Sequence, residues 1–286
     1  MTPRDVEAMQ SAIGRVRRLT DLLNPFPARA FAAALDQAVL PAVGDALPPS
    51  WHWLYFLETP SGRDSDVDGH PRRGSFLPPI PLPRRMWAAG ALNILQPLRL
   101  GTEAEKLSTI QSIDIKEGRT GTLVFVNLVH ELRQCGKVCI REDQSLVYRA
   151  MPSDSTLPPG ERSESVADWS QVLTPDPVLL FRYSALTYNA HRIHYDRDYA
   201  THVEHYPGLV VHGPLLASLL LDRLLREIPG VVVGQFRFRA IRPTFDRGVV
   251  RLCGRRDGSE VKLWTADESE VLGMSATALL REGSAR

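Results

Sequence analysis

One helical segment in the second half of the chain is apolar on most of its circumference. Residues 214–227 follow Gly213 and end before Pro229-Gly230, and these residues are start and stop signals of a helix. The segment carries leucines at Leu215, Leu216, Leu219, Leu220, Leu221, Leu224 and Leu225. A helix with so wide an apolar surface must be buried on nearly all sides, and a sheet wrapped around it provides that burial.

Strand patterns follow this helix and also fill the first half of the chain. The second half shows them at residues 231–239, 249–254, 261–266 and 271–280. The first half shows them at residues 51–57, 91–100, 107–116, 122–131, 137–140 and 146–149. Short turns join most of these runs, which favours antiparallel sheets. The second half therefore predicts a hot-dog arrangement, an α+β fold in which a sheet wraps one long helix, whereas the first half predicts a sheet without an evident central helix.

The length allows two such halves. The chain has 286 residues, of which 43% are hydrophobic, enough for two cores. We expect an N-terminal segment with helices at residues 4–23 and 28–40, and a linker rich in Pro, Ser and Glu between the halves. The resulting division is 1–45 for the N-terminal segment, 46–152 for the first half, 153–175 for the linker and 176–286 for the second half.

The net charge and the cysteine content restrict the possible binding partners and the cellular compartment. A net charge of +1 gives no electrostatic footprint for nucleic acid or an anionic membrane surface, so we expect neither as a partner. No apolar stretch reaches membrane-spanning length. The three cysteines form an odd set without metal-site spacing, which favours free and buried thiols in a reducing cytoplasm. The composition leaves monomer and homodimer both open.

A candidate acid/base group lies just ahead of the long helix. His194 is an imidazole that can exchange a proton near neutral pH, and Asn189 upstream can hold a water but cannot deprotonate it. After the apolar run at residues 209–211, which predicts a short buried strand, Gly213 begins the helix. Glycine lets a ligand approach the backbone, and the free N–H groups of a helix start favour negative charge. These residues predict polarisation of a carbonyl that becomes enolate-like during reaction.

The histidines of this region also allow functions other than acid/base catalysis. Five of the eight histidines, His191, His194, His202, His205 and His212, fall within 22 residues, which raises the question of a metal site. We expect none, because no cysteine or carboxylate cluster completes a ligand set with the usual spacing. His191 either orients the site or satisfies the loop backbone, and His212 is expected to shape the turn before the helix.

Arginines offer candidate contacts for an anionic ligand. Residues 58–85 form a long irregular segment rich in Pro, Gly and Arg, which is typical of either a solvated basic loop or a binding loop. Arg84 or Arg85, next to Trp87 as an apolar wall, would meet a carboxylate or a phosphate. Arg239 and Arg242 are weaker candidates for phosphates of a cofactor moiety; strand alternation favours an exposed position for Arg239.

The motifs around His194 resemble those of a known family. Ile193-His194, the later Ala200 and Val211-His212-Gly213 are similar to the signature of the MaoC-like, or type 2, enoyl-CoA hydratases. This chain departs from that signature at Asn189, where the family usually has Asp, and at His191-Arg192, where it has Asn-Pro. The variant with Tyr188 and Asn189 before it resembles the subgroup of itaconyl-CoA and mesaconyl-CoA hydratases and the 3-hydroxyacyl-thioester dehydratases. Further similar motifs begin at Trp51, Asp68, Gly74 and Pro83.

The resemblance, over about residues 45–286, implies a double hot-dog chain. In such a chain the first half would lack the catalytic motif and would shape the acyl pocket. The implied catalytic residues are His194, Asn189 and Gly213, and the implied substrate contacts are Tyr188, His191 and His212. The implied activity is hydration of itaconyl-CoA or mesaconyl-CoA to citramalyl-CoA, with coenzyme A as part of the substrate and no other cofactor. Two alternatives stay open: a 3-hydroxyacyl-thioester dehydratase of linear fatty acyl chains, and a non-catalytic module that binds acyl thioesters.

Overall fold

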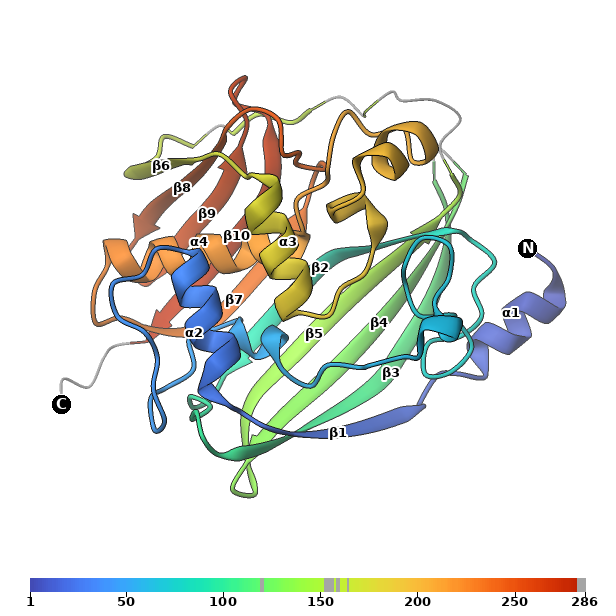
Figure 1. The fold of residues 1–286 in the computed structure, drawn as a ribbon, viewed down its shortest axis with the longest axis horizontal. Coiled ribbons are helices and arrows are strands. Elements are labelled where there is room, and N and C mark those ends of the chain that lie inside the picture. The colour runs from blue at the N-terminus through green and yellow to red at the C-terminus, as the bar shows by residue number, and fades with distance from the viewer. Residues whose placement is uncertain (119–120, 152–156, 158–159, 164, 282–286) are drawn as a thin grey trace.

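A single antiparallel sheet runs through the molecule. The computed structural model describes residues 1–118, 121–151, 157, 160–163 and 165–281. The ten strands follow the order β1-β3-β4-β5-β2-β7-β10-β9-β8-β6. Their bounds are β1 (Val16–Leu22), β2 (Arg84–Ile94), β3 (Glu103–Gly118), β4 (Gly121–Gln134), β5 (Lys137–Arg149), β6 (Trp169–Leu173), β7 (Val232–Ala240), β8 (Val250–Asp257), β9 (Glu260–Ala266) and β10 (Leu272–Arg281). The first five strands of this order come from the first half of the chain, and the remaining five come from the second (Figure 1).

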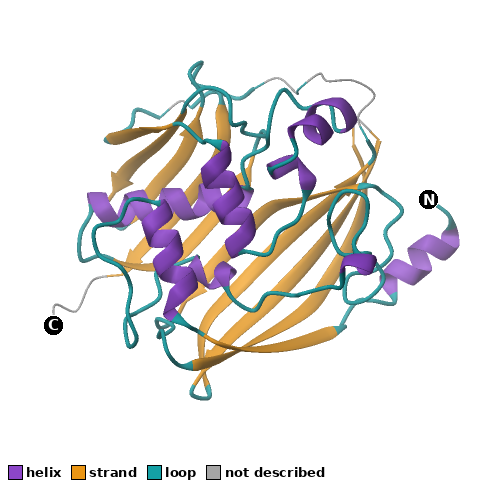
Figure 2. Cartoon of the chain, in the orientation of Figure 1, coloured by secondary structure: helices purple, strands orange, loops and turns teal. Residues whose placement is uncertain are grey.

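The sheet of the second half wraps the long helix as its leucines predict. Helix α4 (Gly213–Glu227) packs on β8, β9 and β10, and eight of its side chains, including Leu215, Leu220 and Leu224, are buried. Helices α2 (Pro25–Ala34) and α3 (Pro177–Leu186) cover the opposite side of α4, and Figure 2 shows these helices gathered on one face of the sheet. Because α4 has apolar neighbours on both sides, it needs no polar stripe.

The first half has a sheet but no long helix at its centre among the described residues. The concave face of its sheet is covered instead by the irregular segment 47–83 and its short 3₁₀ turns η1 (Trp51–Leu54) and η2 (Gly62–Asp64). Phe76 and Ile80 of this segment, with Met9 of α1 (Pro3–Gln10), pack on β3 and β4. The double hot-dog architecture is therefore present, with one helix replaced by chain without regular structure.

The two halves join edge to edge. Strand β2 pairs with β7 from Ala89↔Arg239 to Asn93↔Gln235. At this junction Gly90 lies opposite Phe238, and a Cβ on Gly90 would come within 2.6 Å of the Phe238 ring. Glycine thus allows the ring to lie directly over the strand. Side chains of β2 consequently lie next to elements of the second half.

The structure corrects the predicted N-terminal segment. Only residues Pro3–Gln10 of the predicted helix 4–23 are helical, and Val16–Leu22 form an edge strand paired with β3. Val16 and Leu19 are three residues apart, which suits one face of a helix, but they lie on opposite faces of the strand, so the pairing with β3 outweighs their spacing. The helix predicted at residues 28–40 is α2, which ends at Ala34. The 1–45 segment is thus not wholly helical, and part of it belongs to the sheet.

Other boundaries differ in detail. Residues 51–54 form a 3₁₀ turn rather than a strand, because Trp51, Trp53 and Leu54 are all buried and period-two burial does not hold. The runs at 137–140 and 146–149 form one strand, β5. The apolar run at 209–211 is buried but contributes only a single bridge, between Val210 and Phe245.

The predicted linker, residues 153–175, is only partly a linker. Its residues 169–173 form β6, which pairs with β8 at the edge of the sheet, and residues 152–156, 158–159 and 164 lie outside the described part of the chain. The short helical turns η3 (Arg192–His194) and η4 (Tyr199–Val203), together with α3, precede α4. Cys135, Cys139 and Cys253 are free thiols, and Cys135 is exposed, contrary to the expectation of buried thiols. Among the described residues, no helix combines the length and the hydropathy needed to cross a bilayer.

Candidate active site

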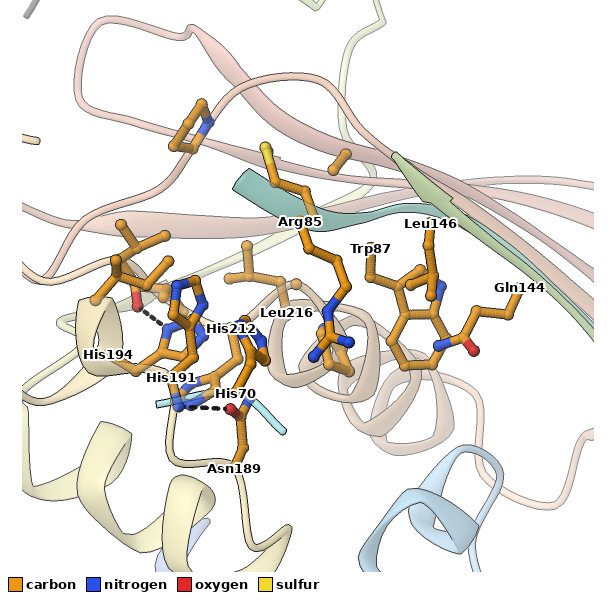
Figure 3. Close-up of a pocket in the computed structure, with 18 of the residues that line it drawn as sticks. His70, Arg85, Trp87, Gln144, Leu146, Asn189, His191, His194, His212 and Leu216 are labelled. Atoms are coloured by element: carbon orange, nitrogen blue, oxygen red, sulfur yellow. Dashed lines mark hydrogen bonds between the residues drawn. The ribbon is translucent and has the colours of Figure 1, made fainter. Parts of the chain in front are cut away.

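A cavity of about 390 Å³ lies between the two halves and contains the predicted acid/base group. The second half contributes His191, His194, His212 and Gly213 to its lining. The first half contributes His70, Arg85, Trp87 and Gln144, among others, and Figure 3 shows His70 beside the histidines of the second half, with Arg85 between this group and Trp87. Apolar side chains complete the walls: Phe76, Leu77, Met86, Leu128, Leu146, Ile193, Leu216 and Met274. The cavity is thus an inter-half pocket with polar groups at defined points.

His194 is held as a neutral base. Its Nδ1–H donates to the carbonyl oxygen of Val210 at 2.7 Å, so the other ring nitrogen, Nε2, carries no proton in the neutral ring and can accept one. Burial lowers the pKa of His194 to about 4, although the hydrogen bond to Val210 acts in the opposite direction. The imidazole is therefore deprotonated at neutral pH and ready to accept a proton.

Asn189 and Gly213 lie on the same cavity with different functions. The Asn189 side-chain oxygen accepts from the His191 backbone N–H at 3.0 Å, which closes the loop before η3 and leaves the amide NH₂ as the free group. Gly213 is the first residue of α4, its N–H has no acceptor among the described residues, and a Cβ there would meet only the Trp87 carbonyl oxygen, at 3.8 Å. The N–H of Gly213 is therefore available to a ligand oxygen at the positive end of the helix.

His191 and His212 flank His194 with their rings. The His212 ring stacks on His194 at 3.6 Å between centroids, and its Nε2 is hydrogen-bonded to Ser184 Oγ at 2.9 Å. The His191 ring stands nearly perpendicular to His194 at 5.4 Å. Burial lowers the pKa of both His191 and His212, so both rings are neutral. The stacked neighbours hold the His194 ring in one orientation without placing a charge beside it.

The structure corrects one of the two predicted arginine contacts. Arg84 is buried outside the cavity lining, where its Nε donates to Glu204 Oε2 at 2.8 Å and its guanidinium lies over the Tyr206 ring. Successive residues of a strand point to opposite sides, so Arg85 instead faces the cavity with Trp87. No hydrogen bond or ion pair engages Arg85 in the part of the chain that the structure describes. Arg84 is thus a structural residue, and Arg85 has a guanidinium available to a ligand.

Replacing Arg84 by methionine is expected to lower the free energy of unfolding by about 3 kcal/mol, because it leaves the Glu204 carboxylate buried without its partner. Urea unfolding at neutral pH measures the change. The exposed Arg63 of η2 provides the control, since Arg63→Met should leave stability unchanged. Adding Glu204→Gln to Arg84→Met should recover part of the loss, and a further drop of similar size would contradict the ion-pair explanation.

Three other predicted residues lie away from the cavity or at its rim. Tyr188 is 55% exposed, has a left-handed φ of 49° and is not among the residues that line the cavity, and its contact with the substrate stays a prediction. Arg239 is on the exposed face of β7, as strand alternation favours, and is also not a lining residue. Arg242 does line the cavity, and its Nε is buried with no hydrogen-bond partner among the described residues. Of the two candidate phosphate contacts, only Arg242 is therefore in position.

The first half places a polar group at the far end of the cavity that the sequence patterns did not indicate. Here His130 and Gln144 line the wall, and the His130 ring is hydrogen-bonded to Ser108 Oγ at 2.8 Å and to Gln144 Oε1 at 3.1 Å. Burial lowers the pKa of His130 to about 3, so its ring is neutral. The Gln144 oxygen therefore accepts from His130 Nε2–H, and the Gln144 amide NH₂ is left for a ligand. Strand alternation alone gave no reason to select these two side chains.

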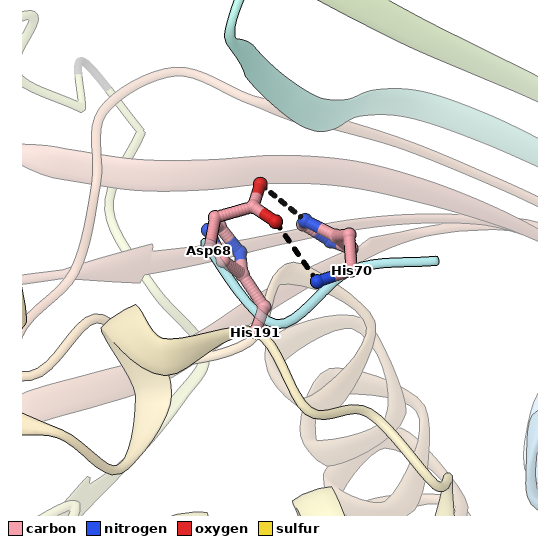
Figure 4. A group of neighbouring side chains, drawn as sticks. All are labelled: Asp68, His70 and His191. Carbon is pink, nitrogen blue, oxygen red and sulfur yellow. Dashed lines mark hydrogen bonds and ion pairs between the residues drawn. The ribbon is translucent and has the colours of Figure 1, made fainter. Parts of the chain in front are cut away.

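Asp68 and His70 also belong to the site but were noted in the sequence only as a motif. Asp68 Oδ2 accepts from His70 Nδ1–H at 2.9 Å, and the His70 ring lies 4.0 Å from that of His191 (Figure 4). The ligand atoms of Asp68, His70 and His191 lie within 4.8 Å of one another, a spacing that a metal ion could use. The positive charge of Arg85 acts on both histidines and disfavours a second cation there.

Five neutral histidines around the cavity make the fold acid-sensitive. Burial lowers the pKa of His70, His130, His191, His194 and His212, to about 4, 3 and 4 for His70, His130 and His194. Below about pH 6.5 the unfolded chain binds protons that the folded chain does not, so stability falls as pH falls from about 6.5 toward 4, by up to about 1.4 kcal/mol per pH unit for each histidine. Urea unfolding at pH 7.5 and pH 5 measures this loss, and equal stability at the two pH values would contradict it.

The fold and the site define a hot-dog protein of the dehydratase type. The crystal structure of a MaoC-like dehydratase from Phytophthora capsici superposes with a TM-score of 0.72 at 14% identity, and the match covers 98% of this chain and 99% of that one. That likeness shows the shared fold. The family described as hydroxyacyl-thioester dehydratase type 2 matches residues 50–246. The chain belongs to this family, which confirms the resemblance found in its motifs.

Two curated relatives span most of the chain. The mesaconyl-C(4)-CoA hydratase of Chloroflexus aurantiacus is 42% identical over 270 residues, which cover 94% of this chain and 96% of the relative. The mitochondrial hydroxyacyl-thioester dehydratase type 2 of Schizosaccharomyces pombe is 30% identical over 246 residues, or 77% of this chain and 80% of the relative. The relatives are thus named for water addition and for water removal, which are two directions of one reaction type.

Proposed function

We propose that the protein is an acyl-CoA hydro-lyase that adds water to an unsaturated five-carbon dicarboxylyl-CoA, with itaconyl-CoA or mesaconyl-CoA as the substrate and citramalyl-CoA as the product. The observation that carries this choice is Arg85, whose guanidinium faces the cavity near the histidines and has no partner among the described residues. Arg85 is partly buried, so its guanidinium would bind an anion well in the cavity, and the free carboxylate of a dicarboxylyl group supplies one. The name of the 42% identical relative supports the same acyl class.

The far end of the cavity also supports a short polar acyl group over a linear fatty acyl chain. His130, Gln144 and the ion pair between Arg17 and Glu58 lie at the cavity wall in the first half. A long apolar chain directed toward this end would bury the Gln144 amide without a partner, which is unfavourable. A short acyl group with a carboxylate can instead be placed between Arg85 and the Gln144 NH₂.

The geometry supports a stepwise addition of water. The thioester carbonyl accepts from the Gly213 N–H, which stabilises the negative charge that forms on its oxygen. In mesaconyl-CoA, whose double bond is conjugated with the thioester, His194 Nε2 takes a proton from a water molecule while the water oxygen bonds to the β carbon and the π electrons move to the thioester. The His194 imidazolium then returns this proton to the α carbon, and the carbonyl forms again. The β,γ double bond of itaconyl-CoA must first become this α,β double bond, by loss of a proton from the α carbon and gain of one at the γ carbon. Atoms and charge balance without any cofactor, and coenzyme A is part of the substrate, with Arg242 at the rim available for its phosphates.

A substrate panel tests the proposal. Purified protein is incubated with itaconyl-CoA, mesaconyl-CoA and crotonyl-CoA, and mass spectrometry follows the gain of one water. We expect hydration of the dicarboxylyl thioesters and weak or no hydration of crotonyl-CoA. A preference for crotonyl-CoA would replace the proposal with a fatty-acyl dehydratase, and turnover of none of the three would favour a module that only binds acyl thioesters.

A further inference from the structure

A turn from the first half is docked onto the catalytic segment of the second. The Asp68 carbonyl oxygen accepts from the Arg192 backbone N–H at 2.9 Å. Between Asp68 and His70, Gly69 has a φ of +89°, and a Cβ on it would lie 1.8 Å from the Ala190 carbonyl oxygen. Only glycine allows both this backbone conformation and this approach. The turn is therefore fitted to the segment that leads into His191 and His194.

This docking presents an Asp–His pair to the cavity. Asp68 holds His70 twice, with Oδ1 accepting from the backbone N–H and Oδ2 accepting from Nδ1–H, both at 2.9 Å. Burial acts to raise the pKa of Asp68, but the hydrogen bonds from His70 and the positive charge of Arg85 outweigh it and hold the pKa below its ordinary value. An ionised Asp68 keeps the proton of the neutral His70 ring on Nδ1, so Nε2 is an acceptor.

Two proton acceptors therefore face the cavity, one from each half. His194 has its proton on Nδ1 because of Val210, and His70 has its proton on Nδ1 because of Asp68. Neither Nε2 has a hydrogen-bond partner in the described part of the chain, and both residues line the cavity. Asn189 lines it too, but an amide cannot take a proton.

We propose, as an extension of the function above, that His70 is a second catalytic residue, which holds the attacking water together with His194, and that Asp68 is its positioning residue. A water that donates one hydrogen to His194 Nε2 and the other to His70 Nε2 has its lone pairs directed away from both rings, toward the β carbon. The first proton moves to His194 and later to the α carbon. The second proton stays on the oxygen and becomes part of the new hydroxyl group, still bound to His70.

Asp68→Asn is the sharpest test, because it keeps the shape of the side chain and removes its charge. The amide can turn its NH₂ toward His70 Nδ1, which moves the ring proton to Nε2 and turns the water acceptor into a donor. We expect kcat to fall about 100-fold with KM within threefold of wild type, since a positioned acid/base group contributes roughly 10²–10⁴-fold. Asp66→Asn is the matched control, because Asp66 is exposed in the same turn and its carboxylate accepts, within the described residues, only from the Val67 backbone N–H.

A double-mutant comparison separates a catalytic pair from a structural one. His70→Gln should lower kcat as much as Asp68→Asn, and the double variant should lose no more than either single variant, because the two residues act as one unit. Losses that multiply, or a kcat of Asp68→Asn within threefold of wild type, would overturn the proposal. We expect the hydratase activity to survive exhaustive treatment with a chelator. If the chelator abolished the activity and a divalent metal ion restored it, the residues would form a metal site rather than the proposed water site.

The tautomer provides a readout that does not depend on turnover. Nitrogen-15 NMR of labelled histidines should show His70 protonated on Nδ1 in the wild type and on Nε2 in Asp68→Asn. If the wild type hydrates no thioester, the proposed function is wrong, but the tautomer shift still shows whether Asp68 controls the ring proton of His70. If the wild type is active and the tautomer does not shift, the role of the Asp68–His70 pair fails alone.

Discussion

His194→Ala is expected to lower kcat for hydration at least about 10³-fold, because among the described cavity histidines of the second half only His194 has its Nδ1–H fixed on a backbone carbonyl, that of Val210, which keeps Nε2 unprotonated. His191 and His212 are neutral as well, but His212 is hydrogen-bonded through Nε2 to Ser184. Steady-state rates with the dicarboxylyl thioester that the wild type prefers provide the measurement. The fall should be in kcat rather than in KM, since the lost group acts on the reacting water.

A histidine outside the cavity provides the control for effects of a His→Ala substitution that are unrelated to catalysis. His202 lies on η4, is exposed and is not a lining residue, so His202→Ala should keep the wild-type rate. The melting temperature of His194→Ala should stay close to that of the wild type or rise, since a buried polar ring is removed. Retention of more than a tenth of the wild-type kcat by a folded His194→Ala protein would contradict the role of His194 as the base.

Arg85→Met is expected to lower kcat/KM for itaconyl-CoA or mesaconyl-CoA about 100-fold and to leave the rate with crotonyl-CoA unchanged or raised. Removing one partner of a buried charge pair costs about 2–5 kcal/mol of binding, which corresponds to that order of loss. Methionine keeps a long side chain next to Trp87, so the shape of the wall changes little. Rates with both substrate types on the same preparations give the specificity ratio directly.

The neighbouring arginines make this test sharp. Arg84→Met should reduce stability, whereas Arg85→Met should reduce only the recognition of the carboxylate, although the two positions are adjacent. Arg63→Met, in an exposed turn of the same irregular segment, should change neither property. An equal loss with crotonyl-CoA and with the dicarboxylyl thioesters in Arg85→Met would assign Arg85 to the common thioester or coenzyme A part of the substrate.

The elements with strong periodicity were predictable from the sequence. Burial can be predicted directly from the leucines of α4 and from the alternating residues of β3, β4 and β7 to β10. The wrapped helix and most of the sheet could therefore be predicted from these patterns. Residues 16–22 were predicted wrongly, because Val16 and Leu19 have a helical spacing although they lie on opposite faces of the strand. Their structure depends on a partner, β3, that lies far along the chain.

The residues of the second half that line the site were predictable in the same sense, whereas those of the first half were predictable only in part, as Arg85 and Trp87. His194 and Gly213 are close in sequence, so local motifs placed them together. Arg84 and Arg85 could not be separated, because the choice of inward residue depends on the register of β2 against β5 and β7. His70 reaches the cavity through contacts between residues more than 100 positions apart, for which a sequence pattern carries no signal.

The edge-to-edge pairing of β2 with β7 has a consequence for how such an enzyme can change. If two identical chains formed such a site together, every substitution would occur in both copies. It would then change the surroundings of the proton-transfer residues and those of the acyl group at the same time. In this chain Arg85, Trp87 and Gln144 are encoded separately from His194 and Gly213. The acceptance of the acyl group can therefore diverge by substitutions in the wall formed by Arg85, Trp87 and Gln144 while His194, Gly213 and the Asp68–His70 turn stay unchanged. This wall of the first half is the place to introduce a new substrate preference without altering the proton-transfer residues.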